Sequence, residues 1–191
     1  MLEDLIHHDE AFFLWLNNMG SSHWDGFWLF ITYKWNFVSL ALYATLIGLS
    51  YKFYGFKKTI LVLVTMAILI LTTDQLANFF KYGVQRLRPC HDPELNSLMR
   101  LVKESCGGKF GYFSAHAANS FAVAFFFTFL LKSKLRYIGI FLMLWAFIVA
   151  YSRIYIGVHF PLDVLTGIGI GLILSWLFSK LFIFAIHRFR L

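Results

Sequence analysis

The side chains best suited to chemistry cluster in the segment Ser152-Arg153-Ile-Tyr-Ile-Gly-Val-His159-Phe-Pro161-Leu-Asp163. Pro161 is typical of a first helical position, so we expect His159 just ahead of a helix and Asp163 in its first turn. The carboxylate could then accept a hydrogen bond from one imidazole nitrogen, which fixes the tautomer and leaves the other nitrogen as a nucleophile or base. Taken alone, the segment also allows a simpler interpretation, in which Asp163 caps the helix and His159 is merely exposed.

A second cluster contains Lys81 and Arg88, seven residues apart and followed by Pro89. Seven residues is close to two helical turns, so both cations would project from one face if the preceding helix continues, and Pro89 would close the element. Two aligned cations suit an anion. The pair by itself is more typical of basic side chains that snorkel at a membrane border.

Ser114 and His116 form the third cluster, where a polar segment turns into an apolar one. Ser114 is a natural N-cap, and the first turn of the helix would offer free backbone N–H groups and the positive end of the helix dipole. An anion bound there would have His116 beside it. The alternative is that His116 is an ordinary residue of the membrane interface.

These clusters must be positioned by elements that cross a membrane. The sequence is 59% hydrophobic and 14% charged, whereas a soluble domain is usually about 25% charged. A bilayer core about 30 Å thick needs roughly 20 apolar residues per helix. Five runs qualify and predict an all-α, polytopic membrane helix bundle: Gly26–Tyr51, where Lys34, Trp35 and Asn36 predict a tilt or bend, Ile60–Phe80, Ser114–Leu131, Arg136–Tyr155 and Leu162–Ile186.

The N-terminal segment Met1–Met19 mixes acidic with apolar residues, which predicts an amphipathic helix lying on the membrane surface. No linker or repeat divides the chain, so residues 1–191 are expected to form a single membrane-embedded domain. The formal charge of +7 could suggest nucleic acid, but no soluble domain is available to present a basic patch. Nucleic-acid binding is therefore not expected, and the sequence does not indicate an oligomeric state.

Alternation of the five spans brings all three clusters to one side, together with an outer loop at residues 81–113. Short basic segments usually remain cytoplasmic, and we treat the basic residues of the outer loop as exceptions that a phosphate site needs. The site is therefore predicted to face the periplasm or exterior of an inner (cytoplasmic) membrane. The basic residues assigned to the inner side are Lys52, Lys57, Lys58, Lys132, Lys134, Arg136, Arg188 and Arg190.

Cys90 and Cys106 both fall in the outer loop, where an oxidising compartment would permit a disulfide that contributes about 3 kcal/mol. The alternative is two free thiols.

Asp74 lies seven residues before Lys81, within a span where a buried carboxylate is costly. We expect it to pair with a basic or polar group beneath the site; a protonated Asp74, or one facing a wet cleft, is the alternative.

The coincidence of three clusters at one membrane face favours a shared phosphate site. Together they resemble the type 2 phosphatidic acid phosphatase superfamily, whose signature is Lys-x6-Arg-Pro, then Pro-Ser-Gly-His, then Ser-Arg-x5-His-x3-Asp. The first and third parts match in full. In the second part Phe113 replaces the proline and Ala115 the glycine, which affects the shape of the loop more than its chemistry.

The resemblance implies that His159 attacks phosphorus to form a phosphohistidine, while Asp163 orients it. His116 would protonate the leaving oxygen and later activate water. The family works without a metal, so neither a metal nor another cofactor is expected. The residues expected to hold the phosphoryl oxygens are Lys81, Arg88, Ser114 and Arg153.

The expected activity is hydrolysis of a lipid phosphate or diphosphate. Undecaprenyl diphosphate is the first choice because its headgroup emerges on the outer face. Phosphatidylglycerol phosphate, phosphatidic acid and lipid A are alternatives, and transfer of phosphate to another lipid would use the same intermediate. A lipid-phosphate binder or transporter component needs the cations but not a nucleophile, an orienting carboxylate and a second histidine together. Vanadate-dependent haloperoxidases share the signature but are soluble.

Overall fold

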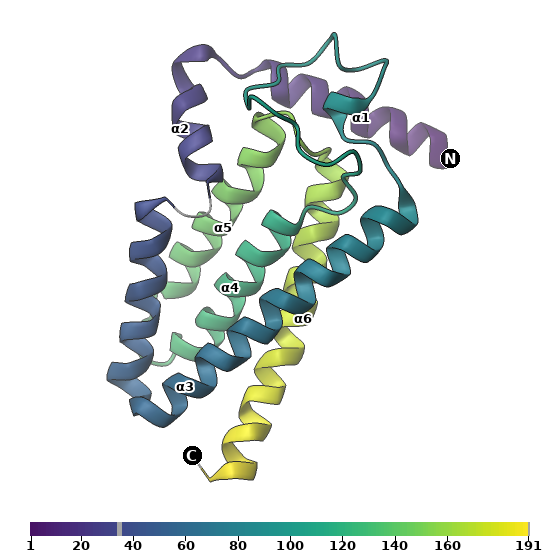
Figure 1. Ribbon diagram of the computed structural model, residues 1–191. Helices are drawn as coiled ribbons and strands as arrows, with labels where there is room; N and C mark the ends of the chain where they lie inside the picture. Colours follow the sequence, from purple (N-terminus) through teal and green to yellow (C-terminus); the bar gives the residue numbers. More distant parts are fainter. Residues whose placement is uncertain (34–35, 191) are drawn as a thin grey trace.

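The structure is a computed structural model that describes residues 1–33 and 36–190, and this part of the chain is an all-α bundle, as predicted (Figure 1). Three segments are long and apolar enough to cross a membrane: Ser22–Val84, Ile138–Tyr155 and Pro161–Phe189, with Ala115–Leu131 as a shorter apolar helix. The helices are α1 (Leu2–Asn18), α2 (Ser22–Thr32), α3 (Phe37–Val84), α4 (Ala115–Leu131), α5 (Ile138–Tyr155) and α6 (Pro161–Phe189), with a 3-10 turn η1 at Pro89–His91.

Helix α3 consists of two arms that meet at Gly55, whose φ of 77° and ψ of 176° are not helical. Glycine adopts a positive φ at little steric cost, which explains why the chain can reverse its direction here. The second arm runs back along α4 and α6 (Figure 1). The turn carries Lys52, Lys57 and Lys58, and it lies at the end of the bundle opposite the outer loop.

The predicted first span, Gly26–Tyr51, is wrong as a single helix. Helix α2 ends at Thr32, Tyr33 is extended, and α3 begins at Phe37. Asn36 explains the break, because its Oδ1 accepts from Ser39 N at 2.8 Å while its Nδ2 donates to Phe30 O at 3.0 Å. One side chain thus caps α3 and holds the end of α2; Lys34 and Trp35, which were part of the predicted bend, lie outside the described residues.

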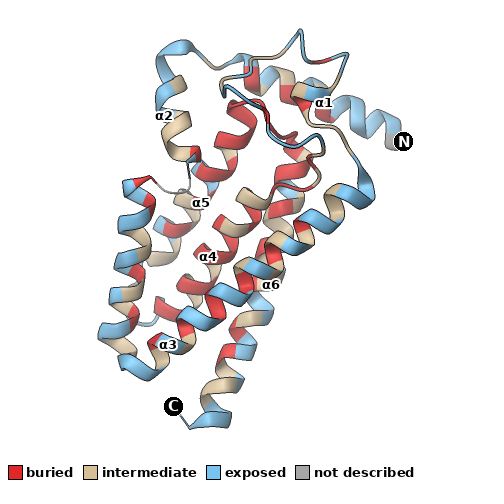
Figure 2. Cartoon of the chain, viewed as in Figure 1, coloured by how far each residue is buried: buried red, intermediate tan, exposed pale blue. Residues whose placement is uncertain are grey.

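Helix α4 is the centre of the bundle and packs against α3, α5 and α6. Burial concentrates along it and at the outer-loop ends of α5 and α6 (Figure 2). Small side chains let the neighbouring backbones approach closely: Ala117, Ala118, Ala122 and Ala124 are all fully buried. As a result, the C-terminal ends of α3 and α5 and the N-terminal ends of α4 and α6 meet under the outer loop.

Helix α1 crosses this same end of the bundle (Figure 1). Phe12 and Trp15 are exposed, as expected of a helix on a membrane surface, but Phe13 is fully buried against Phe160, with ring centroids 5.3 Å apart. Asn17 is also fully buried and donates to Tyr155 O at 2.9 Å. Helix α1 is therefore packed into the protein as well as amphipathic.

Candidate functional site

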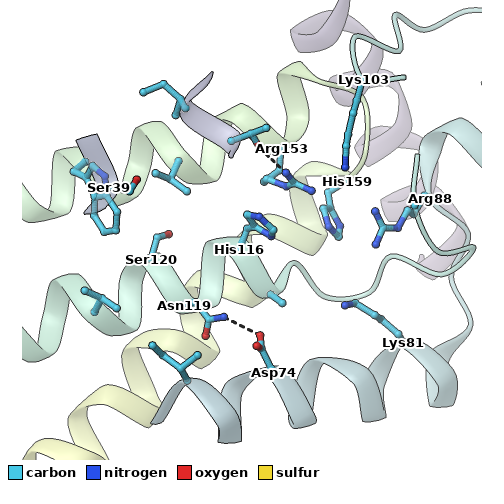
Figure 3. Close-up of a pocket in the computed structure, with 18 of the residues that line it drawn as sticks. Ser39, Asp74, Lys81, Arg88, Lys103, His116, Asn119, Ser120, Arg153 and His159 are labelled. Atoms are coloured by element: carbon cyan, nitrogen blue, oxygen red, sulfur yellow. Dashed lines mark hydrogen bonds between the residues drawn. The ribbon is translucent and has the colours of Figure 1, made fainter. Parts of the chain in front are cut away.

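A cavity of about 480 Å³ opens where these helix ends meet, and side chains from α3, α4, α5 and the connecting loops line it (Figure 3). Basic groups and imidazoles surround its upper part. Lys103, Arg88 and Arg153 converge on His159, and Lys81 reaches toward them from α3, with His116 beside them on α4 (Figure 3). The lining residues that the sequence predicted for the site are Lys81, Arg88, His116, Arg153 and His159.

His159 and Asp163 lie together, as the spacing predicted. His159 Nδ1 is 3.5 Å from Asp163 Oδ2, and the two side chains are 3% and 0% exposed. This distance is longer than a good N–H···O hydrogen bond, and the backbone of Gly111 is a second neighbour of the imidazole. Because Nδ1 faces the carboxylate, Nε2 is the ring nitrogen left for a reaction.

Asp163 also caps α6, as the simpler interpretation of this segment has it, but the exposed His159 of that interpretation is wrong, because His159 is buried. Asp163 Oδ2 accepts from Phe160 N at 3.1 Å, the backbone group ahead of the helix. Asp163 is fully buried and does not line the cavity, whereas His159 does. Asp163 can therefore act on a ligand only through the imidazole.

The surroundings of His159 favour its neutral form. Burial, together with the positive charges of Arg153, Arg88 and Lys81, keeps the pKa of this imidazole well below its usual value. A neutral imidazole has a free lone pair on one nitrogen, which an imidazolium lacks. The surroundings that disfavour a proton on His159 are thus the ones that would favour a bound anion.

The expected helical alignment of Lys81 and Arg88 is wrong. Helix α3 ends at Val84, and Gln85 adopts the left-handed conformation, with φ of 57°. Arg88 therefore lies in an extended segment, where its Nη1 donates to Cys106 O at 2.8 Å and its Nε to Phe110 O at 3.2 Å. The loop folds back on itself, and the two cations still reach one cavity.

Ser114 occupies the N-cap of α4, as predicted, with Ala117 N 3.5 Å from its Oγ. The side chain is fully buried and does not line the cavity. The start of α4 reaches the cavity through Ala115 and His116 instead. Ser114 N donates to Asp163 O at 3.0 Å, which ties the start of α4 to the start of α6.

Arg86 and Asp9 were missed by the sequence analysis. Arg86 Nη1 lies 3.0 Å from Asp163 Oδ1, and its Nη2 lies 2.7 Å from Asp9 Oδ2. Asp9 also accepts from Leu162 N at 2.9 Å, and burial raises the pKa of its carboxyl while Arg86 opposes the rise. The third cation between Lys81 and Pro89 was a signal for Arg86, but no local pattern pointed to Asp9.

Gly111 separates Arg88 from the His159–Asp163 pair. A Cβ atom at this position would lie 3.0 Å from Arg88 Cγ and 3.3 Å from Asp163 Oδ2. Any side chain here would push one of them away. The glycine therefore sets how closely the loop approaches the pair.

The outer loop is fastened at several points. Cys90 and Cys106 form a disulfide, with Cα atoms 6.2 Å apart. Asn17 Oδ1 accepts from Arg100 N at 2.7 Å, and Arg100 pairs with Asp25 at 3.0 Å. The loop also brings Lys103 into the cavity, a residue that no motif had singled out.

Within the described residues, one group of possible metal ligands lies close together: Cys90, His91 and Cys106. Because both sulfur atoms belong to the disulfide, this group offers no thiolate to a metal.

Asp74 has a polar partner beneath the basic groups, as expected: Asn119 Nδ2 donates to its Oδ1 at 2.8 Å. Both residues also line the cavity. Asp74 therefore has a polar partner and also faces a cleft, which the sequence analysis gave as two alternatives.

Comparison with known proteins assigns a family to this arrangement. The family model of the PAP2 superfamily matches residues 57–186. Lipid A 4'-phosphatase of Bacteroides thetaiotaomicron is 36% identical over 93% of this chain and 78% of its own length. Lipid A 4'-phosphatase of Porphyromonas gingivalis is 33% identical over 98% of this chain and 78% of its own length. Undecaprenyl-diphosphatase of Sulfolobus acidocaldarius is 32% identical over 64% of this chain and 54% of its own length.

Two crystal structures share the fold. A transmembrane PAP2 type phosphatidylglycerolphosphate phosphatase from Bacillus subtilis has a TM-score of 0.71 at 24% identity and covers 93% of this chain and 86% of its own. Aquifex aeolicus LpxE has a TM-score of 0.65 at 27% identity and covers 89% of this chain and 93% of its own. The bundle, with its outer loop and cavity, is therefore similar in fold to membrane proteins.

Proposed function

Since this chain belongs to the PAP2 superfamily of metal-independent membrane lipid phosphatases, we propose that it hydrolyses the 4'-phosphate of lipid A through a phosphohistidine at His159. One observation carries the mechanism: a buried, neutral His159 beside Asp163 faces a cavity that is surrounded by cations and holds a second histidine. An integral membrane protein with such a cavity is suited to a substrate whose charge must be neutralised next to a bilayer.

The first chemical step is attack of His159 Nε2 on phosphorus. An N–P bond forms as the bond from phosphorus to the lipid oxygen breaks, and His116 gives its proton to that oxygen. Asp163 stabilises the positive charge that the imidazole acquires. The negative charge on the equatorial oxygens is stabilised by the cations that line the cavity: Lys81, Arg88, Lys103 and Arg153.

The second step releases the phosphate. His116, now neutral, takes a proton from a water molecule as that water attacks phosphorus, and the N–P bond to His159 breaks. Both steps use the same cations, because the transferring group stays in place while the nucleophile changes. Ser114 contributes by fixing the start of α4, from which His116 projects.

Lipid A is favoured over undecaprenyl diphosphate, the first choice from sequence. The relatives named as lipid A 4'-phosphatases match 93% and 98% of this chain, whereas the undecaprenyl-diphosphatase matches 64%. At 98% of this chain, the match to the Porphyromonas gingivalis enzyme reaches into α1, to which Asp9 belongs. These features support lipid A, previously one of the alternatives, as the substrate to test first.

The outward orientation of the site is also part of the proposal. Basic residues gather at the end of the bundle opposite the cavity, in the turn at Gly55, the connection from α4 to α5 and the end of α6 (Figure 1). Short basic segments of this kind usually remain in the cytoplasm. They support an inner-membrane protein whose cavity opens to the periplasm.

The test is phosphate release by purified protein from lipid A, undecaprenyl diphosphate, phosphatidylglycerol phosphate and phosphatidic acid. We expect the highest kcat/KM for lipid A, with loss of the 4'-phosphate seen by mass spectrometry. His159→Ala should release at least about 10³-fold less phosphate. His187→Ala, at the far end of α6, is the matched control and should keep full activity.

Each outcome has a definite meaning. A higher kcat/KM for another lipid would replace lipid A as the substrate and keep the mechanism. If His159→Ala is as active as the wild type, the phosphohistidine mechanism at His159 is wrong. If labelled phosphate is found on a second lipid instead of in solution, the reaction is phosphate transfer and not hydrolysis.

A further inference from the structure

The cavity continues below the basic groups to a polar level formed by Asp74 and Asn119. Asn119 follows His116 by three residues on α4, so both side chains lie on one face, one turn apart. Asp74 precedes Lys81 by seven residues on α3, about two turns deeper. The hydrogen bond from Asn119 Nδ2 to Asp74 Oδ1 joins the two helices beneath the site (Figure 3).

This pair leaves hydrogen-bond acceptors facing the cavity. Asn119 must turn its NH₂ group toward the carboxylate, because a carboxylate only accepts. Its Oδ1 is then directed elsewhere and is buried beside the cavity, not open to a ligand. The carboxylate of Asp74 can accept more hydrogen bonds than the one that Asn119 donates, and Asp74 lines the cavity. An acceptor without a donor is costly, so this level of the cavity favours a ligand that brings donors.

The proposed mechanism puts the leaving group at this level. His116 protonates the oxygen that leaves phosphorus, so the group attached to that oxygen starts beside His116. Asn119 and Asp74 lie beside His116 on the cavity wall, on the side of α3 (Figure 3). The atoms of the substrate nearest the broken bond would therefore contact these two residues.

Below the polar level the lining becomes apolar. Ile70 and Val123 line the cavity and also a groove of about 170 Å³ that lies between the arms of α3 and α4. Tyr43 belongs to both as well, and the groove continues past Ile47, Val62, Leu63, Met66 and Phe127. From top to bottom the order is cationic, hydrogen-bond accepting, then hydrocarbon.

We propose that Asp74 and Asn119 form a specificity subsite for a leaving group that carries a hydroxyl or amide N–H close to the phosphate ester. The proposal rests on the proposed function and deepens it. An acylated sugar has such donors, whereas a diacylglycerol or a polyprenyl chain has none. A leaving group without donors would displace water from these acceptors and make no hydrogen bond in its place. The acceptors would then be left unpaired, and the lipid would bind less well.

The experiment compares kcat/KM for lipid A, which brings donors, with kcat/KM for phosphatidic acid, whose diacylglycerol leaving group has none. Asp74→Leu removes the acceptor, and Asn119→Leu removes the amide that holds it in place, each with a side chain branched at the same carbon. We expect the ratio of lipid A to phosphatidic acid to fall about ten- to hundredfold in each variant. Thr72→Leu is the matched control, since Thr72 is exposed on the same helix and bonds to Ile68 O, and its ratio should not change.

A ratio that stays constant in both Leu variants would overturn the subsite, even if both activities fell, because a purely structural pair would affect the two substrates equally. The thermal unfolding midpoint in detergent identifies a variant that fails to fold, and Asp74→Asn and Asn119→Ala then replace it. Wild-type protein that prefers phosphatidic acid to every donor-bearing lipid also overturns the proposal. If the wild type prefers phosphatidylglycerol phosphate, lipid A fails as the substrate, and the subsite is tested by the same ratio with that lipid.

Discussion

The carboxylates of Asp163 and Asp74, both near the cavity, differ in how many hydrogen-bond and ion-pair partners they have in the protein. Asp163 has partners on both oxygens: Arg86 at Oδ1, and Phe160 N and His159 on the side of Oδ2. Asp74 receives one side-chain hydrogen bond, from Asn119, and faces the cavity. The first carboxylate is fully occupied by the protein and can hold another side chain in place, whereas the second retains capacity for a ligand.

The difference extends to the neighbourhoods of these residues. Around Asp163, α1, α6 and the end of α3 are locked by buried ion pairs, so geometry is fixed before a substrate arrives. Around Asp74, the cavity passes between α3 and α4, and the carboxylate keeps acceptor capacity beyond the one bond from Asn119. Preorganisation suits the wall that performs chemistry, and free acceptor capacity suits the wall that selects a substrate.

Of the changes that test this difference, Asp163→Asn should have the largest effect on activity. The amide keeps the shape of the carboxylate but loses the charge that stabilises and orients the imidazole of His159. We expect kcat for phosphate release to fall about 10³- to 10⁴-fold, with little change in KM. Asp92→Asn, in the outer loop, is the matched control; a kcat equal to that of the wild type would exclude Asp163 as the orienting group.

Arg86→Gln comes next. It leaves Asp9 and Asp163 buried side by side without their shared cation, so the free energy of unfolding should fall by about 3–5 kcal/mol. Asp9→Asn keeps the pair of Arg86 with Asp163 and should cost less. Denaturant unfolding in detergent measures both, with the exposed Arg136→Gln as control, and an equal loss in the two variants would contradict a shared role for Arg86.

The smallest effect concerns pH. Because the pKa of His159 is lowered in the folded protein, the unfolded chain binds the extra proton first as pH falls below about 6.5. The stability that depends on neutral His159 is therefore complete above this pH and is lost at up to about 1.4 kcal/mol per pH unit on acidification. Unfolding of wild-type protein and of His159→Gln between pH 7 and pH 5 should diverge in this direction, and parallel curves would show that His159 is not held neutral.

Local signals predicted much of the molecule. The apolar runs predicted an all-α membrane bundle, because hydrophobic length is a property of contiguous residues. Pro161 and Ser114 marked the starts of α6 and α4, since their backbone chemistry acts within one turn. Those two starts brought His159 and His116 to the same end of the bundle, where the structure joins them in one cavity.

What the sequence could not predict depends on contacts between distant segments. Arg88 reaches the cavity from an extended loop whose shape follows from its bonds to Cys106 and Phe110, not from helical periodicity. Asp9 and Arg86 are 77 residues apart, and no spacing rule connects them. In the first predicted span the sequence indicated a bend near Asn36, but not that Asn36 would cap a new helix and hold the end of the previous one.

The position of Arg86 in the chain has a consequence for biosynthesis. Its two carboxylate partners lie 77 residues before it and 77 residues after it, so one emerges from the ribosome near the beginning and the other near the end of synthesis. Until α6 is inserted, Arg86 has at most one of its two partners. A chain interrupted before Asp163 thus presents an arginine that lacks one of its two carboxylate partners, so this pair of ion pairs is complete only once α6 has been made.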